Sequence, residues 1–521
     1  MSKQPNILMI MTDQQRYDTI AALGHDHMIT PNLDRLAGLG TSFSRCFTAG
    51  ATCISARAAL FTGQYAHNTG VYSFSDWAHQ PSWLQSLRDN GYYLANIGKM
   101  HLEPRDAGQA FHHRLVVENP TTDFLGHNQP DDAWGRFLTD HGYERPLDRH
   151  LEDEQWQQRC QAVPWHLPEA FHSDVFIGDQ ACAWLENWEA NNQPLFLQVG
   201  FVGPHEPYDP IERHLSLYDQ QQMPSATKAA IQNKPVQHQA HQYFNAIRPD
   251  HESQIDLSQQ PESAIAEMRR HYCAKLTTID EKIGQLLETM EAKNLLENTV
   301  VIFTSDHGDM LGDQGLPYKW LMYDAVTRVP LIVWDARQSR GSWTQENKSI
   351  SVTAQSNLVS HMDIGPTILD IANIEKPNWL DGFSFWNQLN QDQPAELRQA
   401  VYCQDNYLTM VRTKTHKLVW YSFAEYAGEL YDLTQDPNET NNLFNAPESL
   451  AVQHSLTVLL WTWLSRSNYR NAGLKTRNIQ EPVLWPQDSP YLHPSALGML
   501  DLLNEQAPEP LKQSTPLEDN L

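Results

Sequence analysis

The stretch Asn6-Ile-Leu-Met-Ile-Met-Thr-Asp13 decides the expected fold, because an apolar run leads there directly into a carboxylate. Two later stretches repeat this arrangement: Leu195–Val199 runs on to His205, and Val300–Phe303 runs on to Ser305-Asp-His307. Continuous apolar and β-branched runs are typical of parallel strands that are covered on both faces. Ligands bind at the carboxyl ends of such strands, so we expect the three polar ends to meet in one site.

Helices are expected between these strands. Apolar side chains recur at steps of three and four from Ile265 to Met290, which predicts one long amphipathic helix. A second helix is expected over Pro31–Leu39, with Thr30 placed to cap it and the proline suited to its first turn. The predicted fold class is therefore α/β, with a large, mixed but mostly parallel sheet sandwiched by helices.

The sequence pattern changes at about residue 390. Short alternating segments that favour antiparallel strands lie around residues 401–402, 408–412, 417–421 and 429–431. Ser449–Leu464 favours a helix over them. For 521 residues we expect two domains, a catalytic α/β domain over 1–389 and a smaller antiparallel α+β domain over 390–521. The Pro-rich tail from about Arg470 is expected to wrap the surface, and it could reach a neighbouring subunit of a homo-oligomer.

The formal net charge of −26 limits the classes of partner. A field of that sign repels phosphates, so we expect no nucleic-acid partner and no membrane partner. An anionic small substrate is compatible with it if a few cations converge locally. No apolar run is long enough to span a bilayer, Met1–Ile10 is better interpreted as a first strand than as a signal peptide, and the six cysteines have no paired spacing. We therefore expect a cytoplasmic protein.

Asp13, Asp306 and His307 are candidate metal ligands. Two carboxylates and an imidazole at strand ends suit calcium, magnesium or manganese. Taken singly, an aspartate after a strand is more often a helix cap or a loop residue, so only the joint occurrence carries the prediction.

The segment Thr52-Cys-Ile-Ser-Ala-Arg-Ala-Ala-Leu-Phe-Thr-Gly63 predicts a loop that enters a short helix. Cys53 lies at the helix start and Arg57 one turn later. A helix N-terminus and a guanidinium group both stabilise negative charge, so together they could activate a thiolate. A buried structural cysteine beside a surface arginine is the alternative for an isolated pair.

Cys53–Gly63 resembles the signature of the type I sulfatases, which belong to the alkaline-phosphatase-like superfamily. Further family-like segments follow in order, so that the resemblance covers roughly residues 5–445. They are Asn6–Asp13, Thr30–Leu36, Gly98–Leu102, Val202–Pro207, Thr304–Asp309, Lys319–Asp324, Ser360–Thr367, Leu430–Leu433 and Asp436–Glu439.

The resemblance implies a built-in cofactor and a metal. In the family, a formylglycine-generating enzyme oxidises the cysteine, here Cys53, to formylglycine, and the hydrated gem-diol of this residue is the nucleophile. The metal, usually Ca²⁺, with Mg²⁺ or Mn²⁺ as alternatives, would be held by the residue at position 53 together with four others. These are Asp13, Gln14, Asp306 and His307.

The remaining implied roles concern the ester. Arg57 would hold the gem-diol, while Lys99 and Lys319 would neutralise the non-bridging oxygens. His205 would protonate the leaving alcohol. His101 would contact the gem-diol and help to expel sulfate from the covalent intermediate. Outside such a pattern, lysines and histidines are by default solvated surface residues or structural ones.

Two positions depart from the family pattern. Ser55 stands where the family usually has proline or alanine, so conversion of Cys53 could require a particular converting enzyme. Gln14 stands where many sulfatases carry another aspartate, which reduces the negative charge around the metal. An Asp-Gln pair with Asp306-His307 also occurs in the related phosphonate monoester and phosphodiester hydrolases.

Three functions are therefore weighed. The first is a sulfatase that hydrolyses a sulfate monoester, because the Lys99-Met-His101 segment resembles the sulfatase arrangement. The second is a phosphonate monoester or phosphodiester hydrolase with the same nucleophile. The third is a pseudoenzyme that binds anions and keeps Cys53 as a thiol, and a leaving-group acid such as His205 argues against it.

The leaving alcohol is expected to be a sugar. The polar and aromatic loops that could line a saccharide pocket are Glu103–Arg114, Thr121–Trp134 and Tyr208–His251. The candidates for contacting a carboxylate or a second sulfate of such a substrate are Arg105, His112, His113 and Arg114. As the alternative, these four are solvated loop residues, and a simple aryl or choline ester stays open.

Overall fold

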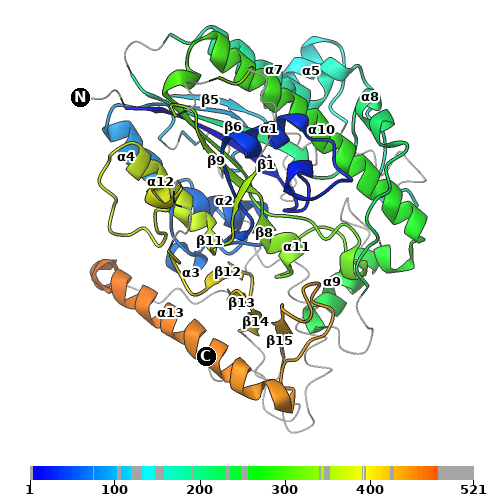
Figure 1. Cartoon of the computed structure of the whole chain (residues 1–521), viewed down its shortest axis with the longest axis vertical. Coiled ribbons are helices and arrows are strands. Elements are labelled where there is room, and N and C mark those ends of the chain that lie inside the picture. The colour runs from blue at the N-terminus through cyan, green and yellow to red at the C-terminus, as the bar shows by residue number, and fades with distance from the viewer. Residues whose placement is uncertain are drawn as a thin grey trace.

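In the computed structural model of the chain, the described residues are 4–73, 75–102, 107–108, 110–118, 132–146, 158–189, 193–228, 235–247, 256–338, 342–344, 352–389, 391, 395–422 and 427–478. They form an eight-stranded mixed sheet with helices on both faces and a separate four-stranded antiparallel sheet (Figure 1). Five of the seven neighbouring strand pairs in the large sheet are parallel, so the predicted fold class is confirmed.

The three strands predicted from the sequence are neighbours at the centre of the large sheet. β1 (Asn6–Asp13) pairs in parallel with β6 (Leu195–Pro204) on one side and with β7 (Thr299–Ser305) on the other. Their carboxyl ends therefore lie together at one edge. The strand order is β10-β2-β9-β7-β1-β6-β4-β5. The other strands are β2 (Thr41–Phe43), β4 (Tyr93–Gly98), β5 (His113–Val116), β9 (Leu331–Asp335) and β10 (Thr353–Gln355).

Alternate side chains of β1 enter two different cores. Leu8 and Ile10 pack into one core, and Ile7, Met9 and Met11 pack into the other. This is the two-residue period of a strand covered on both faces. The first core is closed by α1 (Pro31–Leu39), α7 (Ser173–Glu186) and α10 (Glu262–Ala292), and the second by α2 (Cys53–Thr62), α4 (Trp83–Asp89) and α12 (Ile364–Ile371) (Figure 1).

Helix α1 has the predicted bounds, but its N-terminus is satisfied differently from the prediction. Thr30 does not cap the helix with its side chain. Its hydroxyl lies 3.1 Å from Asp34 Oδ1 and accepts from the amide of Ala21 at 3.0 Å. Asp280 of α10 caps the N-terminus of α1 instead. Its carboxylate accepts from the amides of Asn32 (3.1 Å) and Leu33 (2.7 Å). A cap supplied by another helix cannot be found from local sequence.

The C-terminal sheet matches the predicted short segments. Its antiparallel strands are β12 (Val401–Asp405), β13 (Leu408–Arg412), β14 (His416–Tyr421) and β15 (Gly428–Asp432). Helix α13 (Leu450–Asn478) lies along the outside of this sheet (Figure 1) and is longer than predicted. The tail was expected to wrap the surface from about Arg470, but residues 470–478 continue α13 instead. The rest of the predicted tail lies outside the described residues.

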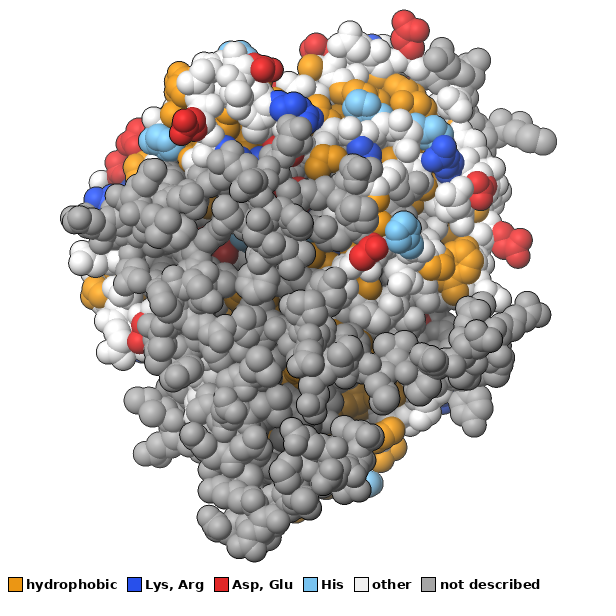
Figure 2. Space-filling view, turned by 180° about the vertical axis from the view of Figure 1, so that it is seen from behind, with side chains coloured by type: hydrophobic (Ala, Val, Ile, Leu, Met, Phe, Trp, Pro, Cys, Tyr) orange, Lys and Arg blue, Asp and Glu red, His pale blue; other side chains and the backbone are white. Residues whose placement is uncertain are grey.

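The remaining elements are short. A three-stranded sheet comprises β11 (Val359–Ser360), β3 (Cys46–Phe47) and β8 (Arg328–Val329), and the connecting helices are α3 (Ala66–Thr69), α5 (Ala133–Asp140), α8 (Glu212–Leu215), α9 (Val236–Ile247) and α11 (Asp324–Thr327). None of the helices in the described ranges is both long and apolar enough to cross a membrane. On the described part of the rear face, acidic and basic side chains are interspersed with apolar ones (Figure 2).

Candidate active site

Cys53 is the first residue of α2 and is buried. Thr52 and Ser55 form a reciprocal capping box that starts the helix directly at the thiol. The Ser55 hydroxyl also lies 3.2 Å from Asp405 Oδ2 at the end of β12, so the C-terminal sheet contacts the first turn of this helix. Burial raises the pKa of Asp405 to about 7 although Thr52 and Ser55 donate to it. The residue that departs from the family pattern is thus a structural part of the cap.

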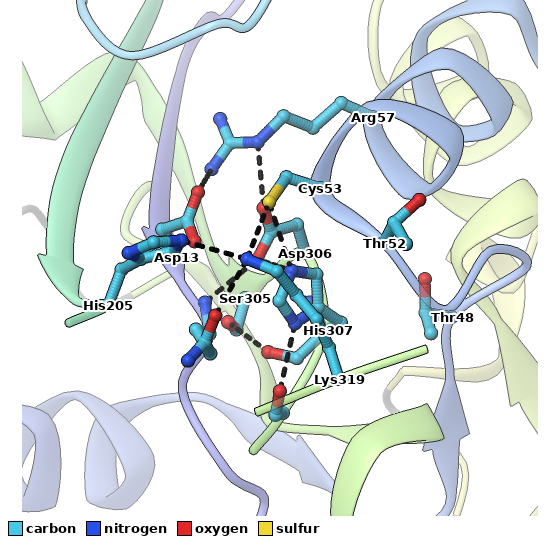
Figure 3. Close-up of polar contacts among 12 residues, drawn as sticks. Asp13, Thr48, Thr52, Cys53, Arg57, His205, Ser305, Asp306, His307 and Lys319 are labelled. Carbon is cyan, nitrogen blue, oxygen red and sulfur yellow. Dashed lines mark hydrogen bonds and ion pairs between the residues drawn. The ribbon is translucent and has the colours of Figure 1, made fainter. Parts of the chain in front are cut away.

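Four potential metal ligands converge on one point. Single donor atoms of Asp13, Cys53, Asp306 and His307 all lie within 4.8 Å of one another, and all four residues are buried. Figure 3 shows these side chains gathered between β1, β7 and α2. The Oδ1 atom of Asp13 is buried and has no hydrogen-bond partner among the described residues. Burial opposes the charge of this carboxyl, but Lys99 and further cations hold its pKa well below the usual range.

Lys99 reaches the site because two glycines allow β4 and β6 to approach closely. Gly98 has a φ of +93°, and a Cβ on it would overlap the carbonyl oxygen of Gly200. A Cβ on Gly200 would in turn overlap the carbonyl oxygen of Lys99. Lys99 Nζ lies 2.6 Å from Asp13 Oδ2, with both side chains fully buried.

Arg57 forms ion pairs with both carboxylates of the candidate metal site, Asp13 and Asp306. Its Nη2 lies 3.1 Å from Asp13 Oδ2 and its Nε lies 2.8 Å from Asp306 Oδ2. Its Nη1 donates to the carbonyl oxygen of Lys99 at 3.1 Å. Burial lowers the pKa of Arg57, but the two carboxylates outweigh this effect and raise it, so the guanidinium stays charged. It therefore acts first as a counter-ion to the metal ligands.

Lys319 links the nucleophile position to the predicted acid. Its Nζ donates to Cys53 Sγ (3.0 Å), Gln14 Oε1 (2.8 Å) and His205 Nε2 (2.8 Å). His205 Nδ1 donates to the carbonyl oxygen of Glu206 (2.9 Å), so its Nε2 is the acceptor. Burial and the ammonium group of Lys319 lower the pKa of His205 well below its usual value, which favours the neutral ring.

His101 is held through its backbone. Its amide donates to Glu118 Oε1 (3.1 Å), and its carbonyl oxygen accepts from Trp77 Nε1 (2.9 Å). The φ of His101 is +59°, which is uncommon for a residue with a side chain. Its ring Nδ1 is buried without a hydrogen-bond partner among the described residues. Burial and Lys99 lower the pKa of this imidazole well below its usual value.

The thiol of Cys53 experiences opposing charges. Burial and Asp13 raise its pKa, but Lys319, Lys99 and His307 outweigh them and lower it from the usual value. For His307, burial lowers the pKa, but the neighbouring Asp306 and Cys53 outweigh this effect and raise it to about 9. The position therefore favours an anionic sulfur or oxygen nucleophile.

The described members of the predicted substrate-binding set, His112, His113 and Arg114, lie at the β4–β5 edge of the large sheet. His112 Nδ1 accepts from the amide of Leu94, and its ring stacks on Tyr93 at 4.8 Å. Leu94 precedes Lys99 by five residues of extended chain, so His112 is roughly 16 Å from the site edge. His113, the first residue of β5, stacks on Trp184 of α7 at 5.6 Å.

The other two residues predicted to bind the substrate are the arginines Arg105 and Arg114. Arg114 donates to Asn96 Oδ1 (3.0 Å) and to the carbonyl oxygen of Ala107 (2.5 Å) on edge strand β5. Arg105 lies outside the described residues. Histidine and arginine in a polar stretch do not reveal which face of an edge strand they occupy, so the substrate-binding role of these residues stays a prediction.

Sequence reasoning missed the carboxylates around Gln14. Its Nε2 lies 2.8 Å from Glu206 Oε2 and 2.6 Å from Asp309 Oδ2. Tyr208 donates its hydroxyl to the same Asp309 oxygen at 2.8 Å. Glu206 and Tyr208 follow the end of β6, and Asp309 follows the end of β7. Their places within or next to the family-like segments could have marked them as site residues.

Comparisons with known proteins identify the family of the chain. The family model described as Sulfatase matches residues 5–374, and the one described as N-sulphoglucosamine sulphohydrolase, C-terminal, matches residues 312–465. The chain is 29% identical to a choline-sulfatase of Rhizobium meliloti, with 87% of this chain and 85% of that protein covered. It is 26% identical to an N-acetylglucosamine-6-O-sulfatase of Bacteroides thetaiotaomicron, with 88% and 86% covered.

A solved structure of another enzyme shares the fold. A phosphonate monoester hydrolase of Agrobacterium radiobacter superposes with a TM-score of 0.70 at 23% identity, covering 89% of this chain and 96% of that one. At that identity the likeness concerns the fold. Since the Sulfatase family model spans well over half of the sequence, the chain belongs to the sulfatase family, within the alkaline-phosphatase-like superfamily, and is a sulfuric ester hydrolase.

Proposed function

We propose that this chain hydrolyses the sulfate monoester of a saccharide, with formylglycine formed from Cys53 as its nucleophile and a divalent cation in the site. The observation that carries the proposal is the convergence of Arg57, Lys99 and Lys319 on the buried cluster around Cys53. These three cations can neutralise an anionic ester within a chain whose formal net charge is −26.

The residues present fit a divalent cation. The buried Oδ1 of Asp13, without a partner among the described residues, is a hard ligand of the kind that Ca²⁺, Mg²⁺ and Mn²⁺ prefer. Asp13, Gln14, Asp306 and His307, with the residue at position 53, would hold the ion, and Ca²⁺ is our first choice. A bound cation would supply Lewis acidity and would lower the pKa of a hydroxyl group next to it.

The protein side chains divide the work on the ester. Lys99 and Lys319 would bind the non-bridging oxygens, because both ammonium groups are buried beside the nucleophile position. His205 would protonate the leaving alcohol. The anionic ester would raise the pKa of this imidazole on binding, so that the ring takes up from solvent the proton that it lacks in the free site. Formylglycine, once formed at position 53, would supply the nucleophilic hydroxyl group of its hydrated aldehyde.

The substrate class rests on the relatives. An N-acetylglucosamine-6-O-sulfatase is among the proteins this chain resembles, which favours a sulfated saccharide. A choline-sulfatase is similarly close, so a small alkyl sulfate is the control substrate. Maturation of Cys53 would require a formylglycine-generating enzyme that accepts Ser55.

A phosphonate monoester or phosphodiester hydrolase is the second candidate. Gln14, in place of a carboxylate, and the structural likeness to a phosphonate monoester hydrolase favour it. The test is kcat/KM of matured, Ca²⁺-loaded protein on matched aryl sulfate and aryl phosphonate esters and on a 6-O-sulfated amino sugar. We expect both sulfate esters to exceed the phosphonate, and a large preference for phosphonate would overturn the proposal.

Mass spectrometry addresses the pseudoenzyme alternative. The peptide that contains Cys53, taken from the native host, should carry formylglycine. An exclusively unmodified thiol there would instead favour an anion-binding protein without turnover.

A further inference from the structure

The amide group of Gln14 is held between two carboxylates. Its Nε2 lies 2.8 Å from Glu206 Oε2 and 2.6 Å from Asp309 Oδ2, and the whole residue is buried. Both hydrogens of the amide are therefore used. Its Oε1 must point the other way, where it accepts from Lys319 Nζ at 2.8 Å, beside Cys53. A flipped amide would set its oxygen against two carboxylates, so the orientation is determined by the partners.

The backbone of Gln14 is fixed as well. Its amide donates to Asp306 Oδ1 at 2.9 Å, and its carbonyl oxygen accepts from the hydroxyl of Tyr272 at 2.7 Å. Its φ is +67°, which is uncommon for a residue with a side chain. The side chain thus starts from a fixed point and ends between fixed carboxylates.

Asp309 cannot turn away from this contact. Its Oδ2 accepts from Gln14 and from the Tyr208 hydroxyl, and its Oδ1 accepts from the amides of Leu311 (2.8 Å) and Tyr318 (3.0 Å). Four donors to one buried carboxylate leave it no other arrangement. The residue contacts no predicted metal ligand except Gln14 through these bonds.

We propose that Glu206 and Asp309 are positioning residues that aim the Gln14 carboxamide oxygen at the metal site, and that they require an amide rather than a carboxylate at position 14. A carboxylate at this position would place an acceptor oxygen, in place of the donating Nε2, within hydrogen-bonding distance of both Glu206 and Asp309. Many sulfatases carry a carboxylate at the position of Gln14. In this chain the acidic groups are instead Glu206 and Asp309, which contact the Gln14 amide.

The amide requirement is tested without metal, by a double-mutant cycle of isosteric changes. Melting temperatures are measured in EDTA for wild type, Gln14→Glu, Glu206→Gln and the double variant. We expect Gln14→Glu to lower the melting temperature by several degrees. The added Glu206→Gln should restore most of the loss, since its amide can donate to the new carboxylate at position 14. Additive effects, or a Gln14→Glu variant as stable as wild type, would overturn the requirement.

The aiming role is tested by a second double-mutant cycle, which combines Gln14→Ala with Glu206→Met. The affinity for Ca²⁺ is measured by calorimetry on unmatured protein. If Glu206 acts through Gln14, the loss of affinity caused by Gln14→Ala should be at least about fivefold smaller when the Glu206→Met change is already present. Equal losses in both backgrounds would mean that Glu206 contributes only its charge, and would refute the aiming role.

This inference rests on the proposed metal site, and an Asp13→Ala variant separates the two. Wild type that binds no Ca²⁺, or Asp13→Ala that binds it equally well, would defeat the metal proposal. The EDTA cycle would still decide whether position 14 requires an amide.

Discussion

Replacing Lys319 by methionine tests the site most directly, because this ammonium group contacts three functional side chains at once. Its Nζ lies 3.0 Å from Cys53 Sγ and 2.8 Å from both Gln14 Oε1 and His205 Nε2. Removing one preorganised donor from a site of developing charge costs roughly 3–4 kcal/mol in the transition state. At about 1.4 kcal/mol for each tenfold change, kcat/KM for a sulfate ester should fall by about 10²–10³-fold.

The same substitution has a second expected effect in unmatured protein. Lys319 is the first of the cations that lower the pKa of the Cys53 thiol against burial and the Asp13 carboxylate. Lys319→Met should therefore raise this pKa. The rate of alkylation by iodoacetamide, measured against pH, should shift to higher pH by comparison with wild type.

Lys417→Met is the matched control. Lys417 is equally buried, but its Nζ lies 2.6 Å from Asp324 Oδ1 and 2.5 Å from Glu439 Oε1, away from the thiol. Breaking that buried group should cost roughly 3–5 kcal/mol of stability and leave the alkylation profile of folded protein unchanged. The reasoning is refuted if Lys319→Met keeps kcat/KM within about threefold of wild type, or if both variants shift the profile equally.

Four further outcomes follow from single contacts. His205→Ala should slow esters of poor leaving alcohols by about 10²–10⁴-fold and activated aryl esters far less; equal losses would remove it from the acid role. EDTA should abolish turnover and Ca²⁺ should restore it, but not in Asp13→Ala; turnover that survives EDTA would argue against a metal. Ser55→Ala breaks the cap shared with Asp405, so urea titration should show a loss of about 1 kcal/mol, and an unchanged midpoint would contradict the role of the cap. Burial raises the pKa of Asp280 to about 7, above the roughly 3.9 of an unfolded chain, so stability should fall as pH rises from about 4 to about 7. Asp280→Asn should flatten the dependence of stability on pH. An unaltered dependence would argue against a raised pKa of Asp280 in the folded protein.

The central strands were predictable because their signal is local. A run such as Ile7–Met11 buries both faces of the chain, and this alone places Asp13 at a strand end. Parallel pairing of β1 with β7 then brings Asp306 beside it without any knowledge of side-chain contacts. The convergence at the site thus follows from sheet direction, while the residue roles came from the family resemblance.

Contacts between distant segments were not predictable in this way. Ser55 meets Asp405 across 350 positions of sequence, and Asn32 meets Asp280 across 248. Neither acidic residue stands in a local pattern that names its partner. For His112 the sequence suggested a contact with the substrate, whereas the contacts that the structure shows are with Leu94 and Tyr93 of β4.

An acidic protein can bind an anionic ester because burial, rather than the total charge, decides the field in the site. Around the nucleophile position, Arg57, Lys99 and Lys319 face the carboxylates Asp13 and Asp306 at short range. These two carboxylates are therefore paired with buried cations before any ligand arrives. A divalent cation would add further positive charge. Solvent and salt screen the charges of exposed side chains beyond roughly 8–10 Å. A sulfate ester that has entered the site therefore responds mainly to the buried cations.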